Sequence, residues 1–121
     1  MVVSEDYVKK HNLNPLTRIV SSAVFGVEPR IMGIGPVGAT HKALKRAGLT
    51  LDEMDVIEIN EAFAAQALAC TRELGLEDTD PRINPNGGAI AIGHPLGVTG
   101  ARLLQTASIE LNKTGKKYAL C

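Results

Sequence analysis

Residues 84–102 read NPNGGAIAIGHPLGVTGAR and hold five of the chain's twelve glycines, two of its six prolines and one of its three histidines. An ordinary helix or strand does not need so many glycines around one histidine. Glycine permits positive φ angles and close approach of the backbone to another group. We therefore interpret this stretch as backbone shaped around a ligand or a reacting group, with His94 as the candidate for chemistry.

The composition is that of one soluble globular domain of 121 residues. Thirteen basic and thirteen acidic residues cancel, so the net charge does not favour nucleic acid or an anionic membrane. No apolar run is long enough to span a membrane. The two cysteines are far apart and no signal peptide is present, which favours a cytoplasmic protein with free thiols.

Strand-like and helix-like segments alternate along the chain. β-branched residues predict a strand over 17–25, and alternation predicts strands over 55–59 and from 117 to 121. Apolar spacing, with Gly48, Gly75 and Gly115 as stops, predicts helices over 36–47, 61–74 and 98–113. We expect a further short helix over 5–11 and a β-like conformation for the glycine-rich stretch. This order predicts an α/β fold with a mostly parallel sheet covered by helices.

Asn60 and His94 each follow a strand-like segment and precede a helix. In open α/β sheets, ligands bind at the carboxyl ends of strands. A helix N-terminus disfavours the charged imidazolium, so a neutral His94 could accept a proton from a nucleophile or donate a hydrogen bond to an oxyanion. Asn60 could hold a water or a carbonyl beside it. The residues alone indicate part of an acyl-transfer or carbonyl-chemistry site without its nucleophile.

Other motifs are weaker. The pattern GIGPVG at residues 33–38 matches a dinucleotide-binding sequence, but only Ile31 and Met32 precede it as strand, so we reject that interpretation. No histidine or cysteine has ligand-spaced neighbours, and we expect no metal. Cys70 fits a core position on its helix. Glu61 stands at the start of the helix predicted over 61–74, where its carboxylate either stabilises the helix dipole or has a catalytic role.

The segment NEAFA at residues 60–64, followed by residues 84–102, resembles the C-terminal domain of thiolases, the acetyl-CoA acetyltransferases and 3-ketoacyl-CoA thiolases. RIMGIGP at 30–36 and KYALC at 117–121 also occur in the family's order. The resemblance covers essentially all of residues 1–121, as one thiolase C-terminal domain. It implies a thiolase-like fold and reversible Claisen chemistry, which is thiolytic cleavage of a 3-ketoacyl-CoA by CoA or condensation of two acyl-CoA molecules.

The resemblance also implies roles for particular residues. His94 matches the histidine that activates the nucleophilic cysteine and contributes to the thioester oxyanion hole, and Asn60 matches the asparagine that positions a water there. Met32 and Phe63 match residues lining the acyl pocket, and Gly93 belongs to the glycines that let the backbone approach the thioester. The implied substrates are acyl-CoA and CoA, and no cofactor is implied. The complete enzyme would be a homo-oligomer, either a dimer or a tetramer, that acts in fatty acid metabolism and β-oxidation.

The catalytic cysteines are missing from the matched pattern. The first belongs to the family's N-terminal half, and aligning the end of the chain places Cys121 at a variable position, three residues before the second. We therefore expect a domain truncated at both ends, without the N-terminal half and the final strand, and inactive alone. The alternatives are a non-catalytic thiolase-like structural or binding module, which would not need both Asn60 and His94, and a ketosynthase relative, which should show a different histidine motif.

Overall fold

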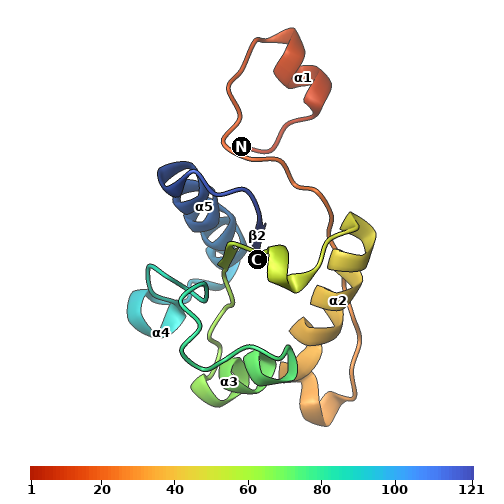
Figure 1. Ribbon diagram of the computed structural model, residues 1–121, viewed down its shortest axis with the longest axis vertical. Coiled ribbons are helices and arrows are strands. Elements are labelled where there is room, and N and C mark those ends of the chain that lie inside the picture. The colour runs from red at the N-terminus through yellow and green to blue at the C-terminus, as the bar shows by residue number, and fades with distance from the viewer.

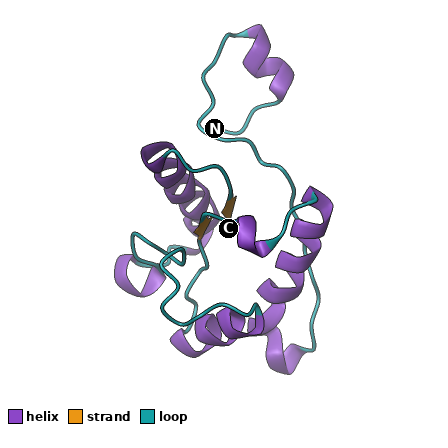
Figure 2. Ribbon diagram, in the orientation of Figure 1, coloured by secondary structure: helices purple, strands orange, loops and turns teal.

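The computed structural model describes residues 1–121 throughout. Helices predominate and surround a short central sheet, while α1 stands apart from the rest of the chain (Figures 1 and 2). None of the helices is long and apolar enough to cross a membrane. The elements in order are α1 (Glu5–Lys10), η1 (Pro29–Ile34), α2 (Gly35–Ala47), η2 (Leu51–Glu53), β1 (Val56–Ile57), α3 (Ala64–Glu73), α4 (Ala89–Ile92), α5 (Leu96–Thr114) and β2 (Ala119–Leu120).

The sheet is parallel and is centred on β1. Val56 pairs with Ala119 and Ile57 pairs with Leu120, so β1 and β2 run in the same direction. On its other edge, Ile57 forms a single parallel bridge with Ile83. The predicted α/β fold with parallel pairing is confirmed, although its regular strands are shorter than the sequence indicated.

Side chains of the central strand alternate between two apolar clusters, as the two-residue period of a strand requires. Ile57 and Ile59 pack on one side with Leu44 of α2 and Leu74 at the end of α3. Val56 points to the other side and packs with residues of α5. Helices therefore cover both faces of the sheet, with α2 and α5 on opposite sides (Figure 1).

The predicted helices at 36–47 and 98–113 are confirmed, with small differences at their ends. Gly48 and Gly115 follow α2 and α5 with φ angles of 67° and 70°. This left-handed conformation is the usual stop that glycine provides. The helix predicted from Glu61 instead begins at Ala64, because Phe63 is still extended at φ −145°.

The prediction of a strand over residues 17–25 is wrong. This segment has no regular secondary structure and pairs with no other backbone. It lies along α2, where Ser21 Oγ donates to the Ala43 carbonyl at 2.8 Å and Arg46 donates to the Ser22 carbonyl at 2.6 Å. β-branched residues favour an extended backbone, but a strand also needs a neighbour of matching register. Here side chains of α2 donate to the carbonyls of the segment instead, Arg46 to Ser22 and Lys42 to Val24.

The β-like conformation expected for the glycine-rich stretch is also wrong over residues 89–92, which form the short helix α4. A run of four small and apolar residues does not distinguish strand from helix by periodicity. Ile90 and Ile92 are both exposed, so no sheet face required the alternation. Gly93 ends α4 with a φ of 95°, a conformation that glycine adopts readily.

Candidate active site

Asn60 and His94 follow two segments that are neighbours in the sheet. Asn60 comes three residues after the end of β1, and His94 follows the segment that begins with the Ile83 bridge and continues through α4. The carboxyl ends of parallel strands form the usual position of a site in this class of fold. No hydrogen bond joins the two side chains directly; the backbone segments that carry them are connected through Asn84 and Glu61.

Asn84 fixes the backbone immediately before Asn60. Its side chain is buried and makes a reciprocal pair with Ile59, accepting from the Ile59 amide at 2.9 Å and donating to the Ile59 carbonyl at 2.9 Å. Its backbone amide donates to the Ile57 carbonyl at 2.8 Å. The φ of Asn84 is 43°, a left-handed conformation that asparagine tolerates better than most residues. Asn84 thus joins the glycine-rich stretch to the end of the central strand.

Glu61 makes the second connection. One carboxylate oxygen accepts from Asn84 Nδ2 at 2.9 Å, and the other accepts from the Ile90 amide at 2.9 Å, at the start of α4. Gly88 lies against the same carboxylate, and a Cβ at that position would overlap it. The loop that carries Asn60 is therefore bound directly to the helix that leads to His94.

His94 is oriented by a threonine on the first turn of α5. Its Nδ1 lies 2.7 Å from Thr99 Oγ1, and Thr99 is buried. The Thr99 hydroxyl also donates to the Pro95 carbonyl at 3.2 Å. The contact between Nδ1 and Oγ1 fixes the orientation of the imidazole ring, and the Pro95 carbonyl in turn fixes the position of the hydroxyl. With Nδ1 engaged by Thr99, Nε2 is the ring nitrogen left free for a reacting group.

Asn60 presents an unused acceptor. Its Oδ1 is buried and has no hydrogen-bond partner within the chain. A buried polar atom of this kind costs free energy unless a partner satisfies it. The amide is therefore a group that a bound water or a ligand donor would stabilise, and its role in holding a water stays a prediction.

Met32, Phe63 and Gly93 are all exposed. Met32 is 78% exposed on η1, and Phe63 is 74% exposed at the start of α3. Their elements are held together because the Gly33 carbonyl accepts from Gln66 Nε2 at 3.2 Å and lies 3.1 Å from the Cys70 sulfur. The two predicted acyl-pocket side chains thus lie on adjoining elements, with large apolar surfaces open to solvent. Gly93 lies between α4 and His94.

Glu58, the residue after β1, is buried without full compensation of its charge. Glu58 is 1% exposed and its carboxylate lies 3.7 Å from Arg102 Nη1, too far for a hydrogen bond. Burial raises the pKa of Glu58, and Arg102 offsets part of that effect.

Although Cys121 is exposed as a residue, desolvation of its thiol and the nearby Glu58 raise its pKa to about 11. At neutral pH Cys121 is therefore a thiol and not the thiolate that a nucleophile requires.

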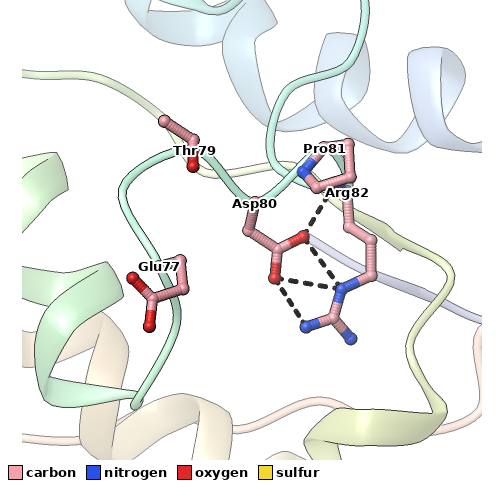
Figure 3. Close-up of a pocket in the computed structure, with 5 residues that line it drawn as sticks. All are labelled: Glu77, Thr79, Asp80, Pro81 and Arg82. Carbon is pink, nitrogen blue, oxygen red and sulfur yellow. Dashed lines mark hydrogen bonds and ion pairs between the residues drawn. The ribbon is translucent and has the colours of Figure 1, made fainter.

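The loop before the glycine-rich stretch has a structural role. Figure 3 shows Asp80 and Arg82 facing one another, with Glu77 apart from that pair. Arg82 donates to Asp80 at 2.7 Å and to the carbonyl of Met54 at 3.1 Å, so this ion pair anchors the loop to the residues that precede β1. The arginine holds the pKa of Asp80 below its usual range. An open depression of about 590 Å³ lies between this loop, α3 and the glycine-rich stretch.

Sequence reasoning missed the contributions of Asn84 and Thr99 to the site. Thr99 could have been found from its position, because a hydroxyl on the first turn of the helix after His94 can reach the imidazole. Asn84 gave no local signal, since the partners of its side chain are Ile59 and Glu61, which lie 25 and 23 residues away in the sequence.

Comparisons with known proteins agree on one family. Residues 13–121 match the family "Thiolase, C-terminal domain". The chain is 60% identical over all 121 residues to the β-ketoadipyl-CoA thiolase of Acinetobacter baylyi and 59% identical over the same length to the 3-oxoadipyl-CoA/3-oxo-5,6-dehydrosuberyl-CoA thiolase of Escherichia coli K12. An acetyl-CoA acetyltransferase of Syntrophomonas wolfei is 49% identical over 120 residues. The chain spans about 30% of the length of each of these relatives.

A solved structure has the same fold. The crystal structure of human mitochondrial 3-ketoacyl-CoA thiolase superposes with a TM-score of 0.87 at 57% identity, covering 96% of this chain and 29% of that one. A second structure of the human enzyme, in complex with CoA, matches equally well. The Asn60 and His94 motifs, the parallel sheet covered by helices and these matches together lead to one conclusion: this chain belongs to the thiolase family and corresponds to its C-terminal domain.

Proposed function

We propose that this chain is the C-terminal domain of an acyl-CoA C-acyltransferase, which cleaves a 3-ketoacyl-CoA with CoA or runs the reverse Claisen condensation. The observation that carries the proposal is the setting of His94, whose Nδ1 lies 2.7 Å from the hydroxyl of the buried Thr99 while Nε2 remains free. A neutral imidazole in this orientation is suited to accept a proton from a thiol. The CoA thioester is the substrate, and we propose no metal or resident cofactor.

In this proposal His94 has two successive functions. Nε2 first takes the proton from the nucleophilic cysteine, a residue supplied from outside residues 1–121. The resulting Nε2–H then donates to the oxyanion that forms when the thiolate attacks the substrate carbonyl. The amide of Asn60 holds a water beside the same oxyanion, and its buried, unpartnered Oδ1 is available to accept from that water. Gly93 leaves the backbone before His94 open to the thioester.

The acyl chain of the substrate would lie along Met32 and Phe63, whose exposed side chains form an apolar surface. The relatives suggest two candidate substrates. β-Ketoadipyl-CoA is named for the Acinetobacter baylyi protein at 60% identity, and acetyl-CoA is named for the Syntrophomonas wolfei protein at 49%. The 60% identity puts β-ketoadipyl-CoA first among the candidates, and human mitochondrial 3-ketoacyl-CoA thiolase, at 57%, makes other 3-ketoacyl-CoA molecules the alternative.

Several apolar side chains on α4 and α5 are also exposed, among them Ile90, Leu96 and Val98. We propose that the remainder of a thiolase polypeptide, in a cytoplasmic homo-oligomer, covers this surface. The isolated chain should have no thiolase activity, because neither of its two cysteines supplies the nucleophile that the reaction requires.

A chimeric enzyme tests the proposal. Residues 1–121 replace the matching segment of the Acinetobacter baylyi thiolase, and thiolysis of β-ketoadipyl-CoA and of acetoacetyl-CoA is followed with CoA as the second substrate. We expect an active chimera with the higher kcat/KM for β-ketoadipyl-CoA. His94→Ala should lower kcat about 10²–10⁴-fold, the range for losing a general base.

His41→Ala, at an exposed position on α2, is the matched control and should leave kcat unchanged. A folded chimera without activity towards either substrate would refute the proposed function. Retention of full kcat by His94→Ala would refute the role of that histidine.

A further inference from the structure

We propose that Glu61 is a positioning residue that holds the Asn60 loop and the His94 segment in one fixed arrangement. The inference rests on the proposed function, since the geometry it maintains matters only if both residues act on one thioester. Glu61 itself would not touch the substrate. Its effect would pass through the backbone of α4 and Gly93 on one side and through Asn60, its sequence neighbour, on the other.

Both oxygens of the Glu61 carboxylate are used by residues far away in the sequence. Oε1 accepts from Asn84 Nδ2 and Oε2 accepts from the Ile90 amide, each at 2.9 Å. The Ile90 amide is one of the first donors of α4, which no preceding helical carbonyl can satisfy. Gly88, the residue before α4, makes no side-chain cap hydrogen bond. Glu61 therefore caps α4 from another part of the chain.

The helix-dipole role considered for Glu61 within its own helix does not apply. α3 begins at Ala64, and Phe63 occupies its N-cap position. Every hydrogen bond of the Glu61 side chain goes instead to the glycine-rich stretch. Because both oxygens already accept hydrogen bonds from the protein, the carboxylate is better suited to hold other groups than to exchange a proton with substrate.

Gly88 provides the space for this contact. A Cβ placed at position 88 would overlap the Glu61 carboxyl carbon and both of its oxygens. Gly88 has a φ of −102° and a ψ of −165°, an extended conformation that alanine can adopt. Gly88→Ala should therefore leave the local backbone intact and displace the flexible carboxylate, which offers a way to remove the contact without changing Glu61.

The expected consequence is a loss of alignment. Freed from Glu61, α4 and the following Gly93–His94 backbone would no longer be fixed relative to Asn60. Misplacement of a catalytic group by about 1 Å can cost about 100-fold in rate. The loss should fall on kcat, with KM little changed, because the exposed acyl-pocket residues Met32 and Phe63 are not attached to α4.

The first test uses four variants of the active chimera: Glu61→Gln, Glu61→Ala, Gly88→Ala and the Glu61→Ala/Gly88→Ala double variant. Glutamine at position 61 keeps the shape of the side chain but offers one acceptor oxygen to the two donors, Asn84 Nδ2 and the Ile90 amide. We therefore expect kcat to fall about 10-fold in Glu61→Gln and about 100-fold in Glu61→Ala. Gly88→Ala should lower kcat in the same way. In the Glu61→Ala background it should have no further effect, because the group it displaces is gone.

Glu73→Gln is the matched control, since Glu73 is an exposed carboxylate near the end of α3, and it should keep the chimera's kcat and KM. Equal kcat in Glu61→Ala and the unmodified chimera would overturn the proposal. Additive losses from Glu61→Ala and Gly88→Ala would overturn it as well, because they would show that Gly88 acts independently of the carboxylate.

The second test does not depend on activity and separates this inference from the proposed function. Amide hydrogen exchange of Ile90 is measured by NMR in the 121-residue chain, with the Leu111 amide of α5 as an internal reference. Glu61→Gln and Gly88→Ala should each accelerate exchange at Ile90 about 10-fold or more and leave Leu111 unchanged. Unaltered exchange at Ile90 in both variants would refute the contact itself, even if the chimera proved inactive.

Discussion

Two buried polar sites flank the central strand, and they are completed to very different degrees. At the Asn84 site, the side-chain amide donates to the Ile59 carbonyl and to Glu61 and accepts from the Ile59 amide, all at 2.9 Å. At the other site, Glu58 and Arg102 approach only to 3.7 Å, and neither carboxylate oxygen nor any guanidinium nitrogen has a hydrogen bond within the chain.

The difference shows which part of the site this chain determines alone. A buried polar network stabilises a fold when every member is satisfied and costs free energy when it is half satisfied. The Asn84 network fixes the relative positions of Asn60 and the glycine-rich stretch using residues of this chain only. The Glu58–Arg102 pair lacks such partners, and in the proposed thiolase we expect further polypeptide to supply them.

Replacing Asn84 should have the largest effect on stability. Asn84→Leu keeps the approximate side-chain volume but leaves the amide and carbonyl of Ile59 and one oxygen of Glu61 without partners. Each unsatisfied buried group costs about 1–3 kcal/mol, so we expect the free energy of unfolding to fall by about 4 kcal/mol in urea denaturation. Asn86→Ala, at an exposed asparagine that bonds Glu110, should change it by less than about 0.5 kcal/mol. If Asn84→Leu and Asn86→Ala lower the free energy of unfolding by similar amounts, then the buried Asn84 network contributes no more to stability than an exposed hydrogen bond.

Breaking the Glu58–Arg102 pair should have the next largest effect. Arg102→Met leaves a buried carboxylate without its counter-charge, which we expect to cost about 3 kcal/mol in the same measurement. Glu58→Gln combined with Arg102→Met removes both charges and should recover most of that loss. If the double variant is no more stable than Arg102→Met, then the unpaired charge is not the cause of the destabilisation.

The pH dependence gives a smaller, signed test. Burial raises the pKa of Glu58 above its ordinary value of 4.5, so the folded state holds this proton more tightly than the unfolded state does. The contribution of Glu58 to the free energy of unfolding should therefore decline as the pH rises from about 4.5 through the raised pKa. Glu58→Gln should lack this decline, and the two stability curves should converge below pH 4.5. If the two stability curves instead run parallel over this pH range, Glu58 is not the group responsible for the decline.

Asp55, at the other end of the same strand, should respond in the opposite sense. The Lys117 and Tyr118 amides each donate to its carboxylate at 3.0 Å and hold its pKa below the usual range. Its contribution is present above its ordinary value of 3.8 and is lost as the pH falls through the lowered pKa. Asp55→Asn is therefore the control that separates the two carboxylates.

The smallest effect is expected at the surface. Arg72 donates to both oxygens of Asp78 at 2.8 and 2.6 Å, a geometry far better than that of Glu58 and Arg102. Solvent screening nevertheless leaves exposed ion pairs of little value. Asp78→Asn should leave the urea midpoint within experimental error of the unmodified chain, at low and at high salt. A clear shift of the midpoint at low salt would show that pair geometry outweighs burial.

The elements predicted well were those with local causes. α2 and α5 follow from apolar spacing and from glycine stops at residues 48 and 115, and the position of His94 before a helix follows from the same pattern. The segment 17–25 was predicted as a strand because its composition favours extended backbone, but pairing depends on a neighbour that composition does not specify. The position of α4 depends on Glu61, 29 residues earlier in the chain, which no local pattern reveals.

The central position of β1 also constrains how the chain can fold during synthesis. Ile57 meets one partner at Ile83, and Val56 and Ile57 meet the other only at Ala119 and Leu120. α2, β1 and α3 therefore leave the ribosome well before the second edge of the sheet exists, and Val56 stays without Ala107 and Leu111 until α5 follows. Contacts of such long sequence separation slow folding because the intervening loop must close first. We therefore expect closure of the sheet on its second edge to be a late and slow step of folding.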